Sequence, residues 1–300
     1  MQNKHYCFLL LIISCLILSC SDNEHLSIDI NKKELPRKNG VSNTYYIGFD
    51  LRWDPVEDVK FYLPLLHHLS SETGYNFKFK IPRSYQENIY MLGNGSVDLS
   101  LMGSVSCMIA NIQFGAEPIV VGLNSNGKPY YKSVIIKKST DRSIKSIANL
   151  KGKKIAFGNM YSTQGYLIPR KLLEDHGISL TNINYEFSES HRDAANKLIN
   201  GFVDAATIQD KLGFKLANEG SVTIITASKI YPSSTVCVSN KIPLEARRKI
   251  KNALLNFYST IDSNSIKLWQ NTEMSKGFID ADKVDFDEIR KLITAYYGIK

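Results

Sequence analysis

The sequence lacks a second long apolar run: after residue 20, no stretch approaches the ~20 apolar residues that a helix needs to cross a bilayer. It has no H-E-x-x-H metal motif, no phosphate-binding P-loop and no evident nucleophile–base pair. His67 and His68 are adjacent, so a helix cannot turn both toward one metal ion. We therefore expect no catalytic centre, no metal and no cofactor. What is present, 300 residues with 43% apolar and 22% charged side chains, is ordinary for a globular protein.

The charge is basic but scattered. The net charge is +8 and falls to +7 without residues 1–19, which contain Lys4 and no acidic residue. A basic balance suits anionic partners, although a solvated surface facing anionic lipid explains it equally well. Zinc-finger spacings and basic stripes interleaved with aromatic residues are missing, so we expect no binding to nucleic acid.

The first residues have the composition of an export signal. Lys4 precedes apolar residues over 8–18, interrupted only by Ser14 and Cys15. This run is too short to span a bilayer as a mature helix. A cationic start, an apolar middle and a small residue before a cysteine predict a signal peptide over residues 1–19.

The segment Ile17-Leu18-Ser19-Cys20 resembles the bacterial lipobox, whose cysteine carries the lipid and becomes the first residue of the mature protein. Cys20 is therefore the predicted lipidation site and membrane anchor. Polar residues dominate 20–43, which we predict as a flexible tether. A plain cleaved signal, or a second register ending at Ser14-Cys15, stays open.

The five cysteines have separate explanations. Cys7 and Cys15 leave with the signal, and Cys20 is the lipid site, so only Cys107 and Cys237 remain in the fold. Two cysteines far apart in sequence do not make a disulfide framework. A single bridge is possible in an oxidising compartment, but two buried free thiols are the favoured interpretation.

Strand-like and helix-like patterns alternate along the remaining chain. Period-2 or continuous apolar stretches predict strands at 44–49, 77–81, 97–102, 119–123, 131–136, 155–157, 184–187, 205–208, 222–227 and 235–238. Helical spacing and closing glycines predict helices at 56–73, 85–92, 104–114, 164–176, 192–200 and within 243–297. Pro64 is expected to kink the first helix or to mark its first turn. The alternation predicts an α/β fold with mostly parallel sheets.

A polar break divides this pattern into two lobes. Residues 124–129 (NSNGKP) interrupt the chain, after which the same order of elements restarts. The apolar helices at the end are expected to pack on the first lobe, reached by a second crossover near residues 228–234. We therefore predict a first lobe of residues 44–124 plus 235–300 and a second lobe of residues 125–234, with two hinge crossovers.

Two loops of the second lobe have the composition of an anion site. Ser162 and Thr163 follow a predicted strand and open a helix, where unpaired backbone N–H groups and the helix dipole favour negative charge. His191 and Arg192 repeat this arrangement after the next predicted strand. Loops after neighbouring parallel strands converge at one edge of a sheet. Simple capping by Ser162 or Thr163, and a solvated His191 or Arg192, are the alternatives.

The ordered strings LKGKKIAFG (150–158), STQGYLIP (162–169), SHR (190–192) and GFVDAA (201–206) are similar to the phosphate/phosphite/phosphonate binding proteins of ABC transporters. Upstream strings, including VDLSLMG (97–103), follow the same order. The resemblance implies a two-lobe type II periplasmic-binding-protein fold with two hinge crossovers.

The resemblance also implies the ligand contacts. Ser162, Thr163, the N–H of Gly165 and His191 would hold a phosphorus oxyanion, namely phosphate, phosphite or a simple phosphonate. Tyr85 of the first lobe would close over it, and a hinge closure would present the ligand to an ABC permease.

Three positions depart from the family, and one loop stays ambiguous. Gln164 stands where a second serine is common, Ser104 where proline is common, and Gln209 near an expected acidic residue. Ser104 and Arg192 would add a donor and a charge, and Gln164 and Gln209 are also predicted to contact the ligand. Gln209 disfavours an amine-bearing ligand, with Asp210 one step away. Arg52-Trp53 belong either to the cleft or to an ordinary loop.

We expect an exported, lipid-anchored monomer that is not an enzyme. The alternatives are a sensory lipoprotein on the same fold and an enzyme similar to those of the menaquinone pathway, against which the export signal argues. Sulfonates and thiamine precursors are other ligands of this fold.

Overall fold

Local sequence signals begin the helices of the computed structural model, which describes residues 44–300. Asp54 caps α1 (Pro55–Thr73) by accepting two backbone N–H groups of its first turn. Ser190 caps α5 (His191–Ile199) through one such bond. These side-chain oxygens satisfy donors that a helix leaves open at its start, so the chain enters each helix at a fixed residue.

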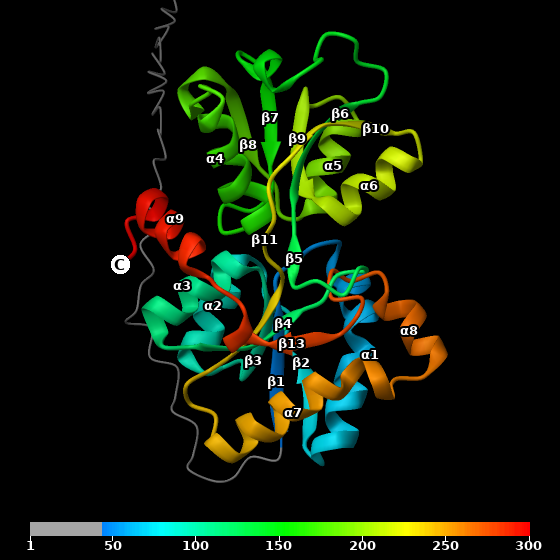
Figure 1. Ribbon diagram of the computed structural model, residues 1–300, viewed down its shortest axis with the longest axis vertical. Coiled ribbons are helices and arrows are strands. Elements are labelled where there is room, and N and C mark those ends of the chain that lie inside the picture. Colours follow the sequence, from blue (N-terminus) through cyan, green and yellow to red (C-terminus); the bar gives the residue numbers. More distant parts are fainter. Residues whose placement is uncertain (1–43) are drawn as a thin grey trace, which may run out of the picture. The chain divides into compact units, whose positions relative to one another are not determined.

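The first of two main sheets has six strands in the order β13-β4-β12-β3-β1-β2 (Figure 1). β1 pairs in parallel with β2 and β3, whereas β12 and β13 run antiparallel to their neighbours. The strands are β1 (Thr44–Phe49), β2 (Asn76–Phe79), β3 (Leu99–Met102), β4 (Glu117–Gly122), β12 (Thr235–Val238) and β13 (Phe278–Asp280). The associated helices are α1, α2 (Tyr85–Asn94), α3 (Ser104–Phe114), α7 (Leu244–Thr260), α8 (Ser263–Trp269) and α9 (Asp287–Tyr297). We call this part the first lobe.

The second main sheet has five strands in the order β10-β6-β9-β7-β8. β7 pairs in parallel with β8 and β9, and β6 runs antiparallel to β9 and β10. The strands are β6 (Ser133–Lys138), β7 (Lys154–Phe157), β8 (Asn184–Phe187), β9 (Ala205–Gln209) and β10 (Val222–Ala227). The helices are α4 (Ile168–Asp175), α5 and α6 (Asp210–Asn218). We call this part the second lobe.

Two short strands carry the chain between the sheets. β5 (Tyr130–Tyr131) leads into the second lobe, β11 (Tyr231–Pro232) leads out of it, and the two pair antiparallel (Figure 1). The two predicted hinge crossovers are therefore confirmed. The strands on either side of the predicted boundaries fall in different sheets, but the described residues form one compact unit. The residue-level division into lobes stays a prediction.

Most predicted elements are present, and the differences have local causes. The predicted helix 164–176 is wrong in its first turn, where Thr163–Leu167 form a π-helical turn and α4 begins at Ile168. Pro169 lies in the first turn of α4, where its missing N–H costs least. Pro64 lies inside α1, which begins at Pro55, so it does not mark the first turn. The helix α6 and the strand β13 were not predicted, and β13 lies inside a segment predicted as helical.

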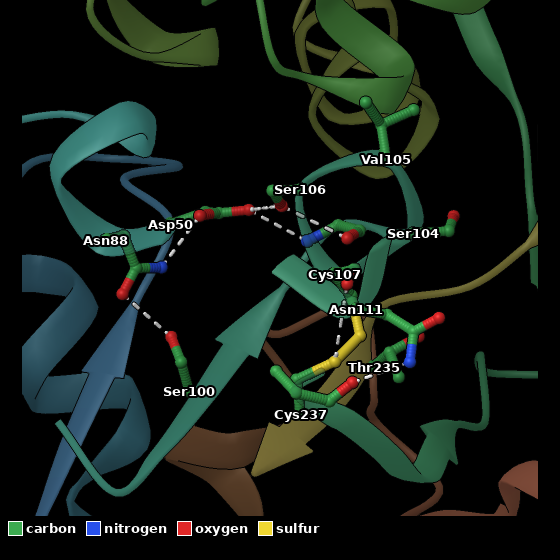
Figure 2. Close-up of a disulfide and its surroundings, with 12 residues drawn as sticks. Asp50, Asn88, Ser100, Ser104, Val105, Ser106, Cys107, Asn111, Thr235 and Cys237 are labelled. Atoms are coloured by element: carbon green, nitrogen blue, oxygen red, sulfur yellow. Dashed lines mark hydrogen bonds between the residues drawn. A yellow bond between two sulfur atoms is a disulfide. The ribbon is translucent and has the colours of Figure 1, made fainter. Parts of the chain in front are cut away.

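The interpretation of Cys107 and Cys237 as free thiols is wrong, because the two form a disulfide (Figure 2). Cys107 lies on α3 and Cys237 on β12, and both are fully buried. β12 lies beside β3, the strand that leads into α3, which brings the two Cα atoms to 6.0 Å. A separation of 130 residues gives no sign of this proximity.

The predicted signal peptide, the lipidation site Cys20 and the tether lie outside the described residues. Within residues 44–300, no helix combines the length and the apolar composition needed to cross a membrane.

Candidate functional site

The candidate site lies where loops of both lobes meet. In the second lobe, the loops after β7 and β8 lead into the Thr163–Leu167 turn and into α5. In the first lobe, the loop after β1 and the starts of α2 and α3 supply the opposing residues. Loops at the carboxyl ends of strands are the usual ligand-binding edge of α/β sheets.

The loop after β7 is folded tightly against its own sheet. Gly158 N–H donates to the Gly165 carbonyl at 2.8 Å, and the Thr207 hydroxyl of β9 donates to the same carbonyl at 2.5 Å. A Cβ on Gly165 would lie 2.8 Å from the Gly158 Cα atom, so glycine is required for this approach. With this carbonyl tied back to the sheet, the hydroxyl groups of Ser162 and Thr163 face the first lobe.

Ser162 and Thr163 are almost completely buried and already hydrogen-bonded. Ser162 Oγ accepts from Gly165 N–H at 3.0 Å and lies 3.4 Å from His191 Nε2. Thr163 Oγ1 accepts from the Val105 N–H of α3 at 2.9 Å. This last bond joins the two lobes directly across the site.

His191 is the first residue of α5 and is 1% exposed. Its Nδ1 has no hydrogen-bond partner, although it is buried. Burial, and then the nearby charge of Arg52, lower the pKa of His191 to about 3. The ring is therefore neutral at pH 7, with one donor and one acceptor nitrogen.

Tyr85, the first residue of α2, faces the site from the first lobe. Its hydroxyl is buried without a hydrogen bond. Burial raises the pKa of Tyr85 well above its ordinary value, with the charge of Arg52 and the Ser162 hydroxyl acting in the opposite direction. The phenol therefore keeps its proton and is available as a donor beside Ser162.

The structure places Ser104 against the hinge. Its hydroxyl donates to the Pro232 carbonyl of β11 at 2.7 Å and lies 3.0 Å from the Tyr131 hydroxyl of β5. The Ser104 side chain therefore joins α3 to both hinge strands. Burial raises the pKa of Tyr131 to about 12, so this hydroxyl also stays protonated.

Gln164, Gln209 and Arg192 lie at the edge of this cluster. Gln164 Nε2 donates to the Lys132 carbonyl at 2.8 Å and approaches Asp210 Oδ1 at 3.3 Å. Gln209 is buried at the end of β9, and its Oε1 has no partner. The Arg192 guanidinium lies 4.6 Å above the Trp53 ring, as a cation–π contact between the lobes. These three residues stay predictions as ligand contacts.

Three charged residues of the first lobe were not among the predicted ligand contacts. Asp50 accepts from Gly103 N–H at 2.8 Å, from Ser106 Oγ at 2.5 Å and from Asn88 Nδ2 at 2.8 Å (Figure 2). These bonds fix the start of α3. Arg52 Nη1 and Glu273 Oε2 form an ion pair at 3.2 Å, with both side chains 4% exposed.

Sequence signals for these residues were weak. Asp50 and Arg52 follow the first strand, where cleft residues occur, but the sequence fits Arg52 equally well to an ordinary loop. Glu273 gave no signal, because it lies between α8 and β13 in a segment predicted as helical. Only the packing of that segment brings Glu273 next to Arg52.

Buried polar atoms without partners gather in this region. Among the described residues, such atoms include Arg52 Nη2, Tyr85 Oη, His191 Nδ1, Gln209 Oε1 and Glu273 Oε1. Buried polar groups normally have partners, so a cluster of exceptions points to a ligand site. No group of three or more His, Cys, Asp or Glu residues suited to a metal occurs within residues 44–300.

A cavity of about 470 Å³ adjoins the cluster. Its lining includes Trp53, Tyr131, Asp210, Phe214 and Glu273. Glu273 belongs to both the cavity and the cluster, and Tyr131 of the cavity lies 3.0 Å from the Ser104 hydroxyl. The cavity therefore adjoins the Glu273 end of the cluster, and its lining does not include Ser162, Thr163 or His191.

Two α/β lobes joined by paired hinge strands, with donors converging from both sides, define a bilobal solute-binding protein. The family model for the periplasmic substrate-binding protein of phosphonate ABC transporters matches residues 47–286. The chain belongs to this family.

Similar proteins agree with this assignment. The phosphate-import protein PhnD of Mycolicibacterium smegmatis is 25% identical over 162 residues, which cover 50% of each protein. The chain thus spans about half the length of this curated relative.

Two solved structures share the type II fold. One is a binding protein of an ABC phosphonate transporter from Pseudomonas aeruginosa, with TM-score 0.73, 22% identity, and 83% of this chain and 85% of that chain covered. The other is PhnD1 of Prochlorococcus marinus in complex with methylphosphonate, with TM-score 0.74, 18% identity, and 86% and 99% covered.

Proposed function

We propose that this protein captures a phosphorus oxyanion, namely phosphate, phosphite or a simple phosphonate, outside the cytoplasm and delivers it to an ABC permease. The observation that carries the proposal is the convergence of neutral donors on one buried region. Ser162, Thr163 and His191 approach from the second lobe and Tyr85 from the first. Neutral, preorganised donors are well suited to a buried anion, because they stabilise its charge without adding charges that must themselves be desolvated.

The same geometry favours binding over catalysis. Ser162 Oγ and His191 Nε2 are 3.4 Å apart, which invites comparison with a nucleophile and its general base. A general base works best with a pKa near the working pH. With its pKa lowered to about 3, His191 is a poor base for Ser162 at neutral pH. We therefore propose a binding protein without a chemical step.

The proposed mechanism is hinge closure. The bond from Val105 N–H to Thr163 Oγ1 and the bond from Arg192 N–H to the Arg52 carbonyl, 3.3 Å, join the lobes on either side of the site. A ligand that contacts both lobes favours the closed form, because it binds that form more tightly than the open one. The closed form would then be recognised by the permease.

The first test is thermal unfolding of the full chain in detergent with phosphate, phosphite, methylphosphonate, 2-aminoethylphosphonate and sulfate. A ligand of the native state raises the unfolding temperature. We expect a rise with at least one phosphorus oxyanion that Thr163→Val removes and that Thr181→Val, at an exposed threonine, leaves unchanged. No rise with any of the phosphorus compounds would contradict the proposal.

We also propose that Cys20 anchors a monomer to the membrane through lipid. The lipobox-like segment before Cys20 supports this. Cells fed a labelled fatty acid should label the wild-type protein but not Cys20→Ala, whereas Cys15→Ala should keep the label. Label that persists in Cys20→Ala would refute this anchor.

A further inference from the structure

Arg52 and Glu273 form a buried ion pair beside the candidate site. Arg52 lies in the loop between β1 and α1, and Glu273 lies between α8 and β13. Both side chains are 4% exposed, so the pair is shielded from water. Two charges in such a place cost desolvation energy that their attraction alone often fails to recover. The pair therefore calls for a reason beyond stability.

Each member of the pair is fixed by further contacts. The N–H groups of Arg52 and Trp53 donate to Asp58 Oδ2 at 2.9 and 3.2 Å, and Arg52 Nε donates to the Tyr62 hydroxyl at 3.3 Å. Glu273 Oε2 accepts from Arg52 Nη1 and from Ser234 Oγ. These contacts leave one atom of each residue without a partner, Arg52 Nη2 and Glu273 Oε1.

The ion pair lies where the two lobes meet, since the Arg52 carbonyl accepts from the Arg192 N–H, next to His191, at 3.3 Å. Burial raises the pKa of Tyr85 and lowers that of His191, and the charge of Arg52 acts on both groups. Glu273 lines the adjoining cavity of about 470 Å³ together with Tyr131. One unpartnered donor atom and one unpartnered acceptor atom thus belong to the same buried ion pair, whose Glu273 member lines the cavity.

We propose that Arg52 and Glu273 recognise the ligand as a donor–acceptor couple. Arg52 Nη2 donates to an ionised oxygen, and Glu273 Oε1 accepts a hydrogen bond from a protonated P–OH oxygen of the same anion. The site then takes a phosphorus oxyanion that keeps a P–OH group and carries a single negative charge, and it rejects sulfate and sulfonates. This inference rests on the proposed function and specifies its ligand.

The physical reason is the missing hydrogen of the rejected anions. A sulfonate or sulfate is fully ionised near neutral pH, so it offers Glu273 Oε1 only another negatively charged oxygen. Buried polar groups that are left unpaired or repelled give strong discrimination between isosteres. The charges of Arg52 and Glu273 also nearly cancel, so the pair favours burial of a monoanion over a dianion.

Other titrating groups face Glu273 and set the useful pH range. Arg52 follows β1, Tyr62 is on α1, Tyr85 on α2 and Tyr131 on β5, and all four interact electrostatically with Glu273. From α6, Asp210 and Lys211 also interact with it. Burial raises the pKa of Asp210 to about 6 and that of Tyr131 to about 12. Burial lowers the pKa of Lys211. The second ionisation of a phosphonate falls between the values for Asp210 and Tyr131.

The experiment is calorimetric titration of the full chain with methylphosphonate and with methanesulfonate, which has nearly the same shape but no ionisable proton. At about pH 6 we expect methylphosphonate to bind at least about 100-fold more tightly. Above the second ionisation of methylphosphonate, its affinity should fall about tenfold per pH unit, because the binding form is lost.

The variant Glu273→Gln keeps the shape of the side chain and removes its charge. Its amide can donate to an ionised oxygen, so the preference for methylphosphonate should shrink to about tenfold or less and its pH dependence should flatten. Arg52→Lys, which keeps the charge but loses the planar fork, should weaken methylphosphonate about tenfold. Glu288→Gln, at an exposed ion pair with Lys229, is the matched control. Methanesulfonate does not ionise in this pH range. Any pH dependence of its binding to Glu273→Gln therefore comes from titrating groups of the protein.

Two results would overturn the inference. In the first, wild type and folded Glu273→Gln show the same selectivity for methylphosphonate over methanesulfonate and the same pH dependence. The other is a preference for 2-aminoethylphosphonate over methylphosphonate that disappears in Glu273→Gln, which would assign Glu273 to an amine. In both cases the proposed function survives, because a phosphorus oxyanion still binds. Failure of every phosphorus oxyanion to bind would instead contradict the proposed function.

Discussion

The two halves of the candidate site are built on different physical principles. The second-lobe half consists of neutral donors on two neighbouring loops, Ser162, Thr163 and His191. The first-lobe half consists of buried charges, Asp50, Arg52 and Glu273, and the protonated phenol Tyr85. The residues of the neutral half lie at the starts of helical segments, and the sequence pattern around each of them marks that position. The charged half depends on contacts between segments far apart in the chain.

The two halves of the site have different roles in ligand binding, one in general affinity for anions and the other in selectivity. Neutral donors bind an anion of any kind, because hydroxyl and N–H groups make little distinction between phosphorus and sulfur oxyanions. A charged pair with one free donor and one free acceptor can distinguish them. We expect the first lobe to decide selectivity and the second lobe to supply most of the general affinity.

The largest expected effect is on stability, from Arg52→Met. Removing one member of a buried pair leaves Glu273 charged and unpaired, which costs about 3–5 kcal/mol of unfolding free energy. The double variant Arg52→Met/Glu273→Met should recover most of this loss. Denaturant unfolding measures both, with exposed Arg142→Met as control. If Arg52→Met and the wild type had equal free energies of unfolding, the ion pair would not contribute to the stability of the first lobe.

The next effect concerns the disulfide under the first-lobe half. Cys107 and Cys237 tie α3, whose start Asp50 holds, to β12 of the sheet (Figure 2). Loss of a native disulfide typically costs about 2–5 kcal/mol. A reducing agent should therefore lower the unfolding temperature of the wild type. It should leave Cys107→Ser/Cys237→Ser unchanged, and an equal response of this variant would show that the reductant acts elsewhere.

The effect that is smallest for each step of the experiment, one pH unit, concerns His191 in the neutral half. The pKa of His191 is lowered to about 3, so the folded protein resists a proton that the unfolded chain accepts below about pH 6.5. Native stability that depends on a neutral ring is complete above that pH and is lost progressively as the pH falls toward 3. Relative to His191→Gln, the wild type should lose about 1.4 kcal/mol per pH unit in this range.

Urea unfolding at a series of pH values measures this difference. The exposed His176→Gln is the matched control, and it should follow the wild type. A constant difference between wild type and His191→Gln across the range would mean that His191 titrates normally.

The grouping of Ser162, Thr163 and His191 follows from the sequence because its signals are local. Hydroxyl residues after a strand and before a helix face the open N–H groups of that helix wherever it packs. The order of strings similar to known binding proteins supplied the type II fold and Tyr85. The contacts of Ser104 and Arg192 could not be predicted in this way. Ser104 donates a hydrogen bond to the hinge, and the Arg192 guanidinium lies over the Trp53 ring, so both contacts depend on segments far away in the chain.

The sequence by itself determined the alternating elements, the hydroxyl residues at helix starts, and the resemblance to the family. These depend on backbone propensities and on neighbours within a few residues. Tertiary structure alone decided the pairing of Cys107 with Cys237 and the meeting of Arg52 with Glu273. Those partners are brought together by the folding of distant segments onto one sheet, and no periodicity or spacing in the chain encodes a distance between segments that touch only after they pack.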